Sequence, residues 1–300
     1  MNNLPNDKRD LKFGSAAAIQ DPETLSLLSI PLDLSCVQET DITEKFLNYY
    51  HNWILSTKNN SIVGLEKFPY LCYSNGTTES FDKFYLANHT RRFRCFKGEY
   101  LYHKLAWRDH FSWAWLEYDD LKENDAVVIS LPFSDLGNQH EGYTDLMEKC
   151  SNLKIPVLVD CAFFGICQNI KFNFDYPCIT DITFSLSKQF PVAHARIGIR
   201  YSVYDTDDTL FVYKKTNYNN RIGSALGLLF IENFSPDFIV DKYKRKQEEY
   251  CQILDVVPSN SVLFGIGGDN WAEYNRGRNT NRLSFHRQYI DGLKNDSPKS

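Results

Sequence analysis

Four short stretches of the sequence carry side chains that could act together in chemistry. Lys188 follows an apolar, strand-like run in "DITFSLSK", and burial or nearby positive charge makes a lysine amine nucleophilic by lowering its pKa. Arg196 comes eight residues later, and its fixed fork of donors suits a phosphate dianion. Asp160 ends the apolar run "VLVD", and Gly76 lies in the turn "SNGTTES". Taken singly, each has an ordinary structural explanation, such as a surface charge, a helix cap or a tight turn.

The positions of these residues in the expected elements favour a shared site. Glycine lets a backbone approach an anion, and the free N–H groups at a helix start bind phosphate, which fits Gly76 before an expected helix. A carboxylate after a buried parallel strand, such as Asp160, lies where α/β proteins bind ligands. Lysine, carboxylate, arginine and helix amides together supply what pyridoxal phosphate requires: an amine for an imine, a partner for the pyridine nitrogen and phosphate ligands. We therefore interpret the four stretches as a pyridoxal-phosphate site.

The motifs resemble those of the fold-type-I pyridoxal-phosphate enzymes, the aspartate-aminotransferase-like (class I/II aminotransferase) superfamily. The resemblance covers roughly residues 65–290 and is most specific at "VLVDCAFFG" and "SLSKQFPVAHARIG". It implies that Lys188 is the Schiff-base lysine and that Asp160 pairs with the pyridinium nitrogen. It also implies cofactor contacts from Gly76, Thr77, Thr78, Tyr100, His103, Ser134, Ser185, Ser187 and Arg196.

Three of the implied roles concern the ring and the substrate. Tyr100, in "GEYLYH", would stack on the pyridine ring and take part in catalysis, although a core tyrosine on a strand fits the pattern equally well. His103 would be a hydrogen-bond partner of Asp160 behind the ring. Arg282, in "TNRLSFHR", would bind the α-carboxylate of an amino acid as a bidentate pair, and Arg276, Arg278 and Arg287 are near enough in sequence to be alternatives for that role.

The sequence departs from the family pattern at the two groups that normally hydrogen-bond the cofactor's phenolic oxygen. Ser134 stands in the place of an asparagine, and Phe163 in the place of a tyrosine, which removes a donor. We expect the pKa of the imine to be raised as a result. The favoured function is an aminotransferase acting on an α-amino acid and a 2-oxo acid. A lyase, decarboxylase or racemase on an amino-acid substrate remains an alternative, as does a non-catalytic member of the fold.

The elements that must position these residues alternate between strand and helix patterns. Helical spacing of apolar residues occurs at 42–56, from 77 onward, and at 143–153, 222–234 and 237–254. Strand patterns occur at 68–74, 93–102, 125–132, 155–163, 181–187 and 196–201, and the segments 261–268 and 281–287 precede a polar tail. This order predicts an α/β fold: a mostly parallel sheet with helices on both faces, plus a small α+β domain formed by the two chain ends.

The predicted domains are an N-terminal arm with part of the small domain (1–50), a large cofactor-binding domain (51–235), and a C-terminal small domain with a polar tail (236–300). The net charge of −5 over 300 residues argues against nucleic acid as a partner. The eight cysteines form no Cys-x-x-Cys pair, so we expect reduced thiols and no metal. No apolar run is long enough for a bilayer, and a cytoplasmic protein is expected. The resemblance implies a homodimer, with Asn220, Arg221 and Ser224 near the partner's site.

Overall fold

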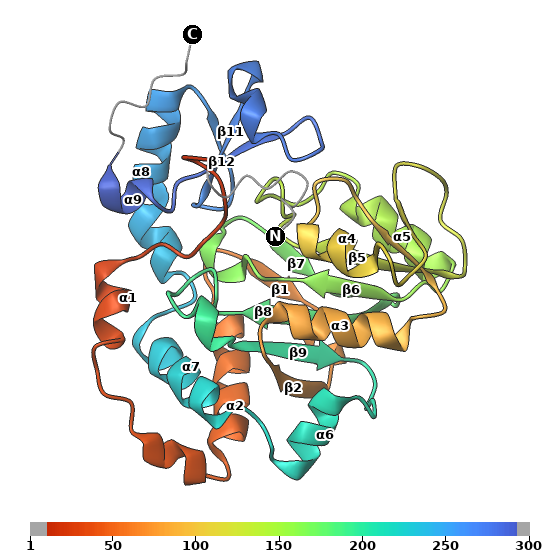
Figure 1. Cartoon of the computed structure of the whole chain (residues 1–300), viewed down its shortest axis with the longest axis vertical. Coiled ribbons are helices and arrows are strands. Elements are labelled where there is room, and N and C mark those ends of the chain that lie inside the picture. Colours follow the sequence, from red (N-terminus) through yellow and green to blue (C-terminus); the bar gives the residue numbers. More distant parts are fainter. Residues whose placement is uncertain (1–10, 293–300) are drawn as a thin grey trace.

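A computed structural model describes residues 11–292. Their strands form one large sheet and two small sheets. Figure 1 shows the large sheet with helices in front of it and behind it, and a smaller layer of strands and helices beside one end. The large sheet has seven strands in the order β2-β9-β8-β6-β5-β3-β4. Their bounds are β2 Tyr70–Ser74, β3 Arg92–Cys95, β4 Trp113–Trp115, β5 Asp125–Ser130, β6 Val157–Asp160, β8 Ile179–Ser185 and β9 Gly198–Ser202.

The large sheet is mostly parallel, because β9 alone of its strands runs antiparallel to both of its neighbours, β2 and β8. Parallel strands bring their carboxyl ends to one edge, and Ser130 at the end of β5 lies in register with Asp160 at the end of β6. Asp160 is in turn beside Thr183 of β8. The carboxyl ends of the adjacent strands β5, β6 and β8 therefore lie together at the edge where α/β proteins bind ligands.

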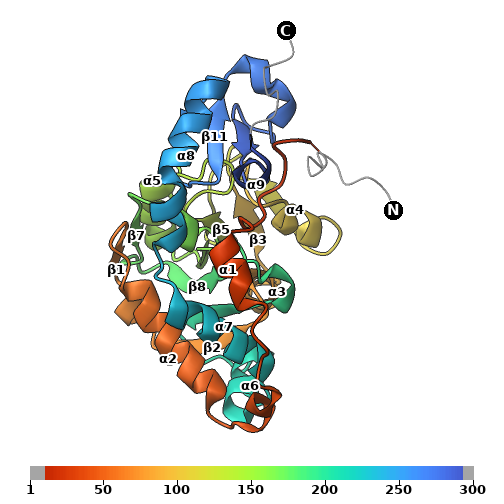
Figure 2. The same cartoon turned by 90° about the vertical axis from the view of Figure 1, so that its left-hand side faces the viewer.

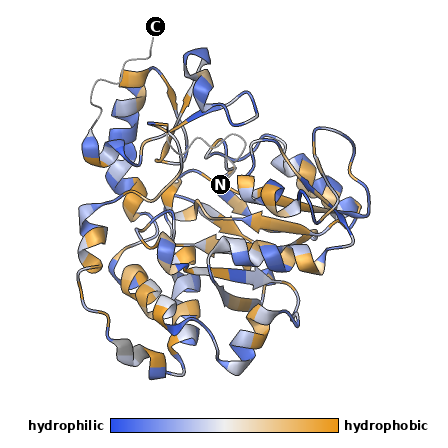
Figure 3. Ribbon diagram, viewed as in Figure 1, coloured by the Kyte–Doolittle hydropathy of each residue, from blue (hydrophilic) through white to orange (hydrophobic). Residues whose placement is uncertain are grey.

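The side chains of the central strands alternate between two hydrophobic cores, as the period of two in a strand requires. Val127 and Ile129 face the core that contains α2 (Ile42–Leu55), α5 (Tyr143–Asn152) and α7 (Arg221–Asn233). Ala126 and Val128 face the core that contains α3 (Thr77–Ala87) and α4 (Leu101–Trp107). Figure 2 shows α2 and α3 on opposite sides of the sheet, and Figure 3 shows hydrophobic residues concentrated in the middle strands. Both faces are thus covered, as the sequence predicts.

The small three-stranded antiparallel sheet has its own core, built from both ends of the described chain. Its strands are β10 Val257–Pro258, β11 Phe264–Gly267 and β12 Asn281–Ser284, next to α8 Phe238–Leu254 and α9 Gln288–Asp291. Phe13 and Ile19 are buried in this core, and the Ser284 amide donates a hydrogen bond to the Phe13 carbonyl oxygen at 2.8 Å. The N-terminal segment is therefore packed against the C-terminal strands. Together with the large sheet, this arrangement confirms the predicted fold class.

The remaining elements connect these layers. They are α1 Pro22–Leu27, β1 Ser61–Val63, β7 Lys171–Asn173, α6 Thr209–Thr216, and the 3₁₀ turns η1 Leu34–Gln38, η2 Leu65–Lys67, η3 Phe164–Ile166, η4 Ala193–Ala195 and η5 Asp269–Tyr274. The parallel pair β1 and β7 forms the second small sheet. None of the helices within residues 11–292 is long and apolar enough to cross a membrane.

Two sequence-based expectations on element boundaries need correction. The strand predicted over 93–102 ends at Cys95, because Gly98 turns the chain with φ of +87° and α4 follows. The predicted boundary at residue 50 falls inside α2, whose Phe46 and Tyr50 belong to the core of the large sheet. Part of the expected arm (1–10) and part of the polar tail (293–300) lie outside the described residues.

Candidate active site

A cavity of about 540 Å³ opens at the carboxyl ends of β5, β6 and β8, within the size range of small-molecule sites. It is lined by the large sheet and its loops, by α3 and α4, and by residues from both ends of the chain. The predicted site residues that line it are Thr77, Thr78, Tyr100, Ser134, Asp160, Ser187, Lys188, Arg196 and Arg282. Most of the predicted site therefore meets in one place.

Lys188 lies just after β8 and reaches into this cavity. Its Nζ donates a hydrogen bond to the backbone oxygen of Ala16 at 2.5 Å, on the segment that comes from the N-terminal end. Burial lowers the pKa of the amine to about 8, with the charge of Arg282 acting in the same direction and the Asp160 carboxyl opposing it. The amine is thus partly unprotonated near neutral pH, which nucleophilic or base chemistry requires.

Asp160 ends β6 and is almost fully buried. Its Oδ1 accepts a hydrogen bond from the Ala162 amide at 3.0 Å. Burial and the nearby Glu99 raise the pKa of the carboxyl to about 7, although the Ala162 amide and Lys188 act to lower it. For both Asp160 and Lys188 burial outweighs their mutual attraction, so each charged form is disfavoured by its surroundings in the protein. A cationic ring nitrogen next to Asp160 would restore its ionised state.

The start of α3 and the Arg196 side chain together form an anion-binding cradle. Gly76, with φ of +74°, precedes the helix, whose first turn has no side-chain cap. Arg196 packs directly on this glycine: a Cβ there would lie 2.4 Å from the Arg196 Nη2. Nη2 also donates to the hydroxyl of Thr78 at 2.8 Å. Free helix amides, hydroxyls and a guanidinium around one point are the donors that a phosphate monoester requires.

The three predicted serines differ in their positions. Ser134 and Ser187 line the cavity, and the backbone oxygen of Ser134 accepts a hydrogen bond from Arg282. Ser185 is outside the lining, since its hydroxyl lies 2.8 Å from the Ser187 hydroxyl and 3.1 Å from the backbone oxygen of Ile197. A direct phosphate contact from Ser185 remains a prediction, whereas Ser134 and Ser187 are the predicted serines that line the cavity.

The aromatic residues also differ from expectation. Tyr100 precedes α4 in a loop instead of lying on a strand, and it lines the cavity with its side chain partly exposed. His103 is fully buried but is not among the lining residues; its Nδ1 lies 2.5 Å from the Tyr85 hydroxyl, and its Nε2 has no hydrogen-bond partner among the described residues. The predicted bond from His103 to Asp160 is therefore not formed. Phe163 lines the cavity and packs on Phe264, with ring centroids 5.3 Å apart.

Two arginines, the buried Arg282 and the partly exposed Arg276, reach the cavity from the side of the small antiparallel sheet. Arg282, on β12, donates hydrogen bonds to the backbone oxygens of Ser134 and Ser15, and its Nε is unpartnered within residues 11–292. Burial lowers the pKa of Arg282, and the nearby Arg276 charge adds to this. Arg276 makes only a loose ion pair with Asp135, at 3.8 Å. The Arg282 guanidinium is thus incompletely satisfied within residues 11–292, and with the neighbouring Arg276 it suits an anionic substrate group.

Sequence reasoning gave no role to two buried acids at this site, Glu99 and Asp135. Glu99 directly precedes Tyr100, and both Asp135 oxygens are buried with no hydrogen-bond partner among the described residues. The only sequence signal for Asp135 is its place directly after Ser134. For Glu99 no signal existed, because its burial depends on the turn at Gly98.

Three residues were predicted to reach a partner subunit, and for Ser224 the prediction is wrong. Ser224 is fully buried between α7 and α2, with its hydroxyl 3.0 Å from that of Thr43. Asn220 accepts a hydrogen bond from the Gly223 amide at the start of α7, and Arg221 donates to the backbone oxygen of Val37. These two are partly exposed and remain predictions for a partner contact.

Comparison with solved structures finds the same architecture across most of the chain. Histidinol-phosphate aminotransferase from Sinorhizobium meliloti, in complex with pyridoxal-5'-phosphate, matches 90% of this chain and 85% of its own, with 12% identity and a TM-score of 0.63. L-threonine-O-3-phosphate decarboxylase from Porphyromonas gingivalis matches 93% and 99%, with 14% identity and a TM-score of 0.60. The pyridoxal-phosphate-bound C-S lyase from Staphylococcus hominis matches 95% and 92%, with 9% identity and a TM-score of 0.60.

The chain has the fold of the fold-type-I pyridoxal-phosphate enzymes. At these identities the likeness concerns the fold, and the three structures carry three different activities. No protein-family model matches the sequence, and no curated protein sequence matches it. The case for a function therefore rests on the residues around the cavity.

Proposed function

We propose that this protein holds pyridoxal phosphate on Lys188 and acts as an aminotransferase on an α-amino acid and a 2-oxo acid. The observation that carries the proposal is the convergence of the Lys188 amine, the buried Asp160 carboxyl and the Arg196–α3 cradle on one cavity. A cofactor with an aldehyde, a basic ring nitrogen and a phosphate has one group for each of these three. When bound, it supplies an electron sink for negative charge at the substrate Cα.

The residues of the chain divide the remaining work. Asp160, once ionised, would keep a proton on the ring nitrogen. Lys188, with its lowered pKa, would accept and return the proton at the substrate Cα. Arg282 would pair with the α-carboxylate and so orient the amino group toward Lys188. Tyr100 would cover one face of the ring.

The unsatisfied groups in the cavity wall and directly behind it argue against a protein that keeps the fold without binding a ligand. The Arg282 Nε and both Asp135 oxygens are buried without a hydrogen bond inside the described chain. Leaving such groups unpaired costs stability unless a bound molecule or ordered water completes their hydrogen bonds. A non-catalytic member of the fold would have no reason to maintain this arrangement. A cytoplasmic homodimer remains our expectation for the assembly.

A visible spectrum followed by an amino-acid panel tests the proposal. Purified protein supplied with pyridoxal phosphate should develop an absorbance band that an amino donor bleaches, with pyridoxamine phosphate as the product. Addition of a 2-oxo acid should then restore the band. Colourless protein that stays so in excess cofactor would support the non-catalytic alternative and remove the proposal.

A lyase, decarboxylase or racemase is the second candidate, and Phe163 is the observation that favours it. Its ring lines the cavity and offers no hydrogen bond, and Ser134 engages Arg282 through its backbone oxygen. Without these donors the balance among the possible cleavages at Cα could differ from that of a transaminase. Bleaching without accumulation of pyridoxamine phosphate, but with release of carbon dioxide, a side-chain fragment or the opposite enantiomer, would identify this class.

A further inference from the structure

Residues 14–17, here called the strap, line the cavity on the way from the small antiparallel sheet to α1 (Figure 1). The chain is fixed on both sides of the strap. On one side, Phe13 is buried in the small core, and its backbone oxygen accepts a hydrogen bond from the Ser284 amide at 2.8 Å. On the other side, Asp21 is the buried N-cap of α1 and accepts a hydrogen bond from the Tyr243 hydroxyl at 2.7 Å. The strap is therefore held beside the cavity at both ends.

Two backbone oxygens of the strap accept hydrogen bonds from the two cations to which we assign the amine chemistry and the carboxylate contact. The Lys188 Nζ donates to the Ala16 oxygen at 2.5 Å, and the Arg282 Nη2 donates to the Ser15 oxygen at 3.2 Å. In contrast, the amides of Ser15, Ala16 and Ala17 donate no hydrogen bond within residues 11–292. The hydrogen bonds that hold residues 15–17 in the described chain therefore come from these two cations.

Ser15 has a backbone conformation that depends on its surroundings. Its φ of +67° lies in the left-handed region, which is unfavourable for a residue with a Cβ. Such a conformation persists only where neighbouring contacts hold it. The hydrogen bond from Arg282 is one of these contacts, so its loss should allow Ser15 to return to a negative φ. Rotation at Ser15 reorients the chain that follows and would turn the Ala16 oxygen away from Lys188.

A carboxylate is a better partner for Arg282 than the strap is. The Nε and Nη2 atoms lie on the same edge of the guanidinium. Nη2 donates to the Ser15 oxygen, whereas Nε has no partner within the described residues. A carboxylate on this edge can accept from both nitrogens at once, and these hydrogen bonds are charge-assisted. A carboxylate that binds there should therefore displace the Ser15 oxygen and also satisfy the donor that the strap leaves unpaired.

We propose that the strap couples Lys188 to Arg282: a carboxylate on Arg282 releases the Lys188 amine, and an aldehyde that engages this amine releases Arg282. Such a coupling is reciprocal by thermodynamic necessity. Ser15 and Ala16 are positioning residues, because they act through the two cations. The role of the coupling in catalysis rests on the proposed function, whereas the contacts themselves need no cofactor. In that reaction, loading of Lys188 would prepare Arg282 for the amino acid.

The reactivity of Lys188 in the cofactor-free, full-length protein tests the coupling. Brief reductive methylation with formaldehyde, followed by digestion and mass spectrometry, gives the labelling rate of Lys188 relative to that of the exposed Lys149. Propionate, a carboxylate without an amino group, should raise this relative rate by about fivefold or more. Arg282→Met should raise the rate measured without propionate, because one contact of the strap is lost, and should remove the response to propionate.

Two substitutions of Ser15 test the strap itself. A β-branched valine fits the left-handed conformation worse than serine does, so Ser15→Val should speed the labelling of Lys188 in the absence of propionate. Glycine adopts a positive φ without strain, so Ser15→Gly should label Lys188 no faster than the wild type. Arg245→Met removes an exposed arginine of α8 and is the control, which should respond to propionate as the wild type does.

The coupling is refuted if propionate leaves the labelling of Lys188 in the wild type unchanged or slows it, or if Arg282→Met responds as the wild type does. If Ser15→Val does not fold, elastase digestion of the wild type decides. This protease cleaves after small residues, and propionate should accelerate its cleavage after Ala16 or Ala17.

A separate sample with added pyridoxal phosphate keeps the two proposals apart. If no visible band develops, the proposed function is removed, whereas a response of Lys188 labelling to propionate would still support the coupling. If the band develops but propionate does not change the labelling, the coupling alone is removed.

Discussion

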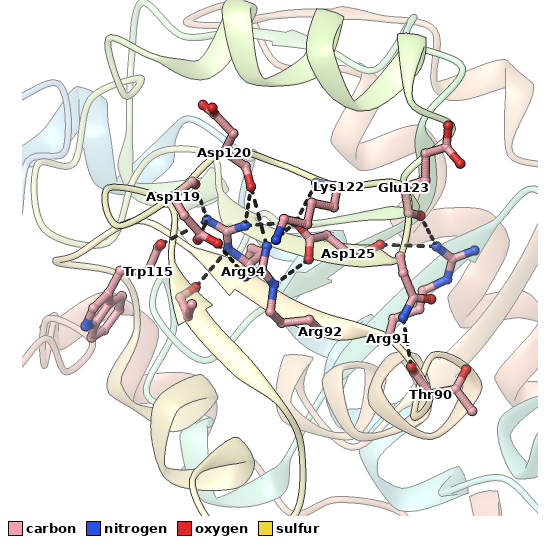
Figure 4. A network of polar contacts seen from close by, with 12 residues as sticks. Thr90, Arg91, Arg92, Arg94, Trp115, Asp119, Asp120, Lys122, Glu123 and Asp125 are labelled. Atoms are coloured by element: carbon pink, nitrogen blue, oxygen red, sulfur yellow. Dashed lines mark hydrogen bonds and ion pairs between the residues drawn. The ribbon is translucent and has the colours of Figure 1, made fainter.

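Two groups of buried charges in this protein have opposite hydrogen-bonding states. The first, here called the edge network, consists of Arg92, Arg94, Asp119 and Asp125 at the edge of the large sheet (Figure 4). Arg94 is fully buried, and all three of its guanidinium nitrogens donate hydrogen bonds. Their acceptors are a carboxylate oxygen of Asp125 and the backbone oxygens of Ala114, Trp115, Asp119 and Asp120.

The second, the cavity cluster, consists of Lys188, Arg276, Arg282 and Asp160, which line the cavity, and of the buried Asp135 that pairs with Arg276. Here the Arg282 Nε and both Asp135 oxygens lack partners within residues 11–292, and the ion pair between Arg276 and Asp135 is 3.8 Å long. Both groups contain arginines and aspartates, and Arg94 and Asp125 of the first are as deeply buried as Asp135 and Asp160 of the second. Their difference shows that burial alone does not mark a functional charge. Incomplete satisfaction inside the chain does, because a ligand can then supply the missing contacts.

Lys188→Ala should have the largest effect of the variants considered: it should abolish the chemistry of the cavity cluster and leave the fold intact. Turnover should fall by on the order of 10⁴-fold or more, since the only amine among the lining residues is removed. The visible band of the cofactor-bound protein should disappear, whereas the unfolding midpoint in urea should stay near that of the wild type. Lys149→Ala, on the exposed side of α5, is the control and should keep the band. A retained band in Lys188→Ala would contradict the assignment.

Asp125→Asn tests the opposite behaviour in the edge network. It leaves the buried Arg94 with the more exposed Asp119 as its remaining carboxylate partner, which should lower the free energy of unfolding by about 3–5 kcal/mol. Cofactor affinity of the folded fraction should be unchanged. Asp119→Asn is the matched control, and its loss should be much smaller because Asp119 is more exposed than Asp125. If urea titrations gave the two variants the same decrease in the free energy of unfolding, the proposed difference between buried and exposed members of the network would be contradicted.

Arg282→Met should weaken the function without weakening the fold. Loss of the pair with an α-carboxylate should raise KM for the amino acid by about 10–100-fold, the equivalent of a charge-assisted hydrogen bond. The free energy of unfolding should not decrease, because a poorly satisfied buried cation is removed. Arg276→Met in parallel decides which arginine binds the carboxylate. A loss of stability as large as that of Asp125→Asn would show that Arg282 is structural.

The smallest effect is a difference in the sign of the pH dependence of stability, at most about 1.4 kcal/mol per pH unit for each group. The arginines lower the pKa of Asp125 despite its burial, so its contribution to stability is present above about pH 4 and is lost as pH falls further. Burial raises the pKa of Asp160 to about 7. Its ionisation therefore costs stability progressively as pH rises from about 4 to 7 in the cofactor-free protein.

Unfolding of Asp125→Asn and Asp160→Asn across pH 3–8 measures this contrast. The free energy of unfolding of Asp125→Asn is expected to be lower than that of the wild type, and this difference should shrink in acid. The free energy of unfolding of Asp160→Asn should instead rise relative to that of the wild type as the pH approaches neutral. Parallel curves for the two variants would mean that the two carboxyls have similar environments.

The sequence predicts the part of the site that depends on strand ends. Lys188 and Asp160 follow buried strands, and parallel strands must bring such ends together, so their meeting needed no knowledge of the side-chain packing. Ser224 and His103 could not be placed in this way, because helix contacts with Thr43 and Tyr85 determine where they lie. Glu99 was missed for the same reason.

The prediction of a strand through Tyr100 is wrong because a turn interrupts the local sequence pattern. Alternating apolar residues continue past Cys95, but Gly98 adopts a positive φ and its Cα approaches the Asp135 carboxyl so closely that a Cβ would lie 2.9 Å from Oδ2. The chain then begins α4 and presents Tyr100 to the cavity. A close tertiary contact at one glycine thus decides where a candidate catalytic residue lies.

Borohydride reduction followed by peptide mapping is the most direct measurement of the central claim. The full-length protein would be incubated with pyridoxal phosphate, reduced, digested and analysed by mass spectrometry. We expect a single added phosphopyridoxyl group, on the peptide that contains Lys188. Modification at another lysine, or none above the level of a Lys188→Ala control, would contradict the proposed cofactor site.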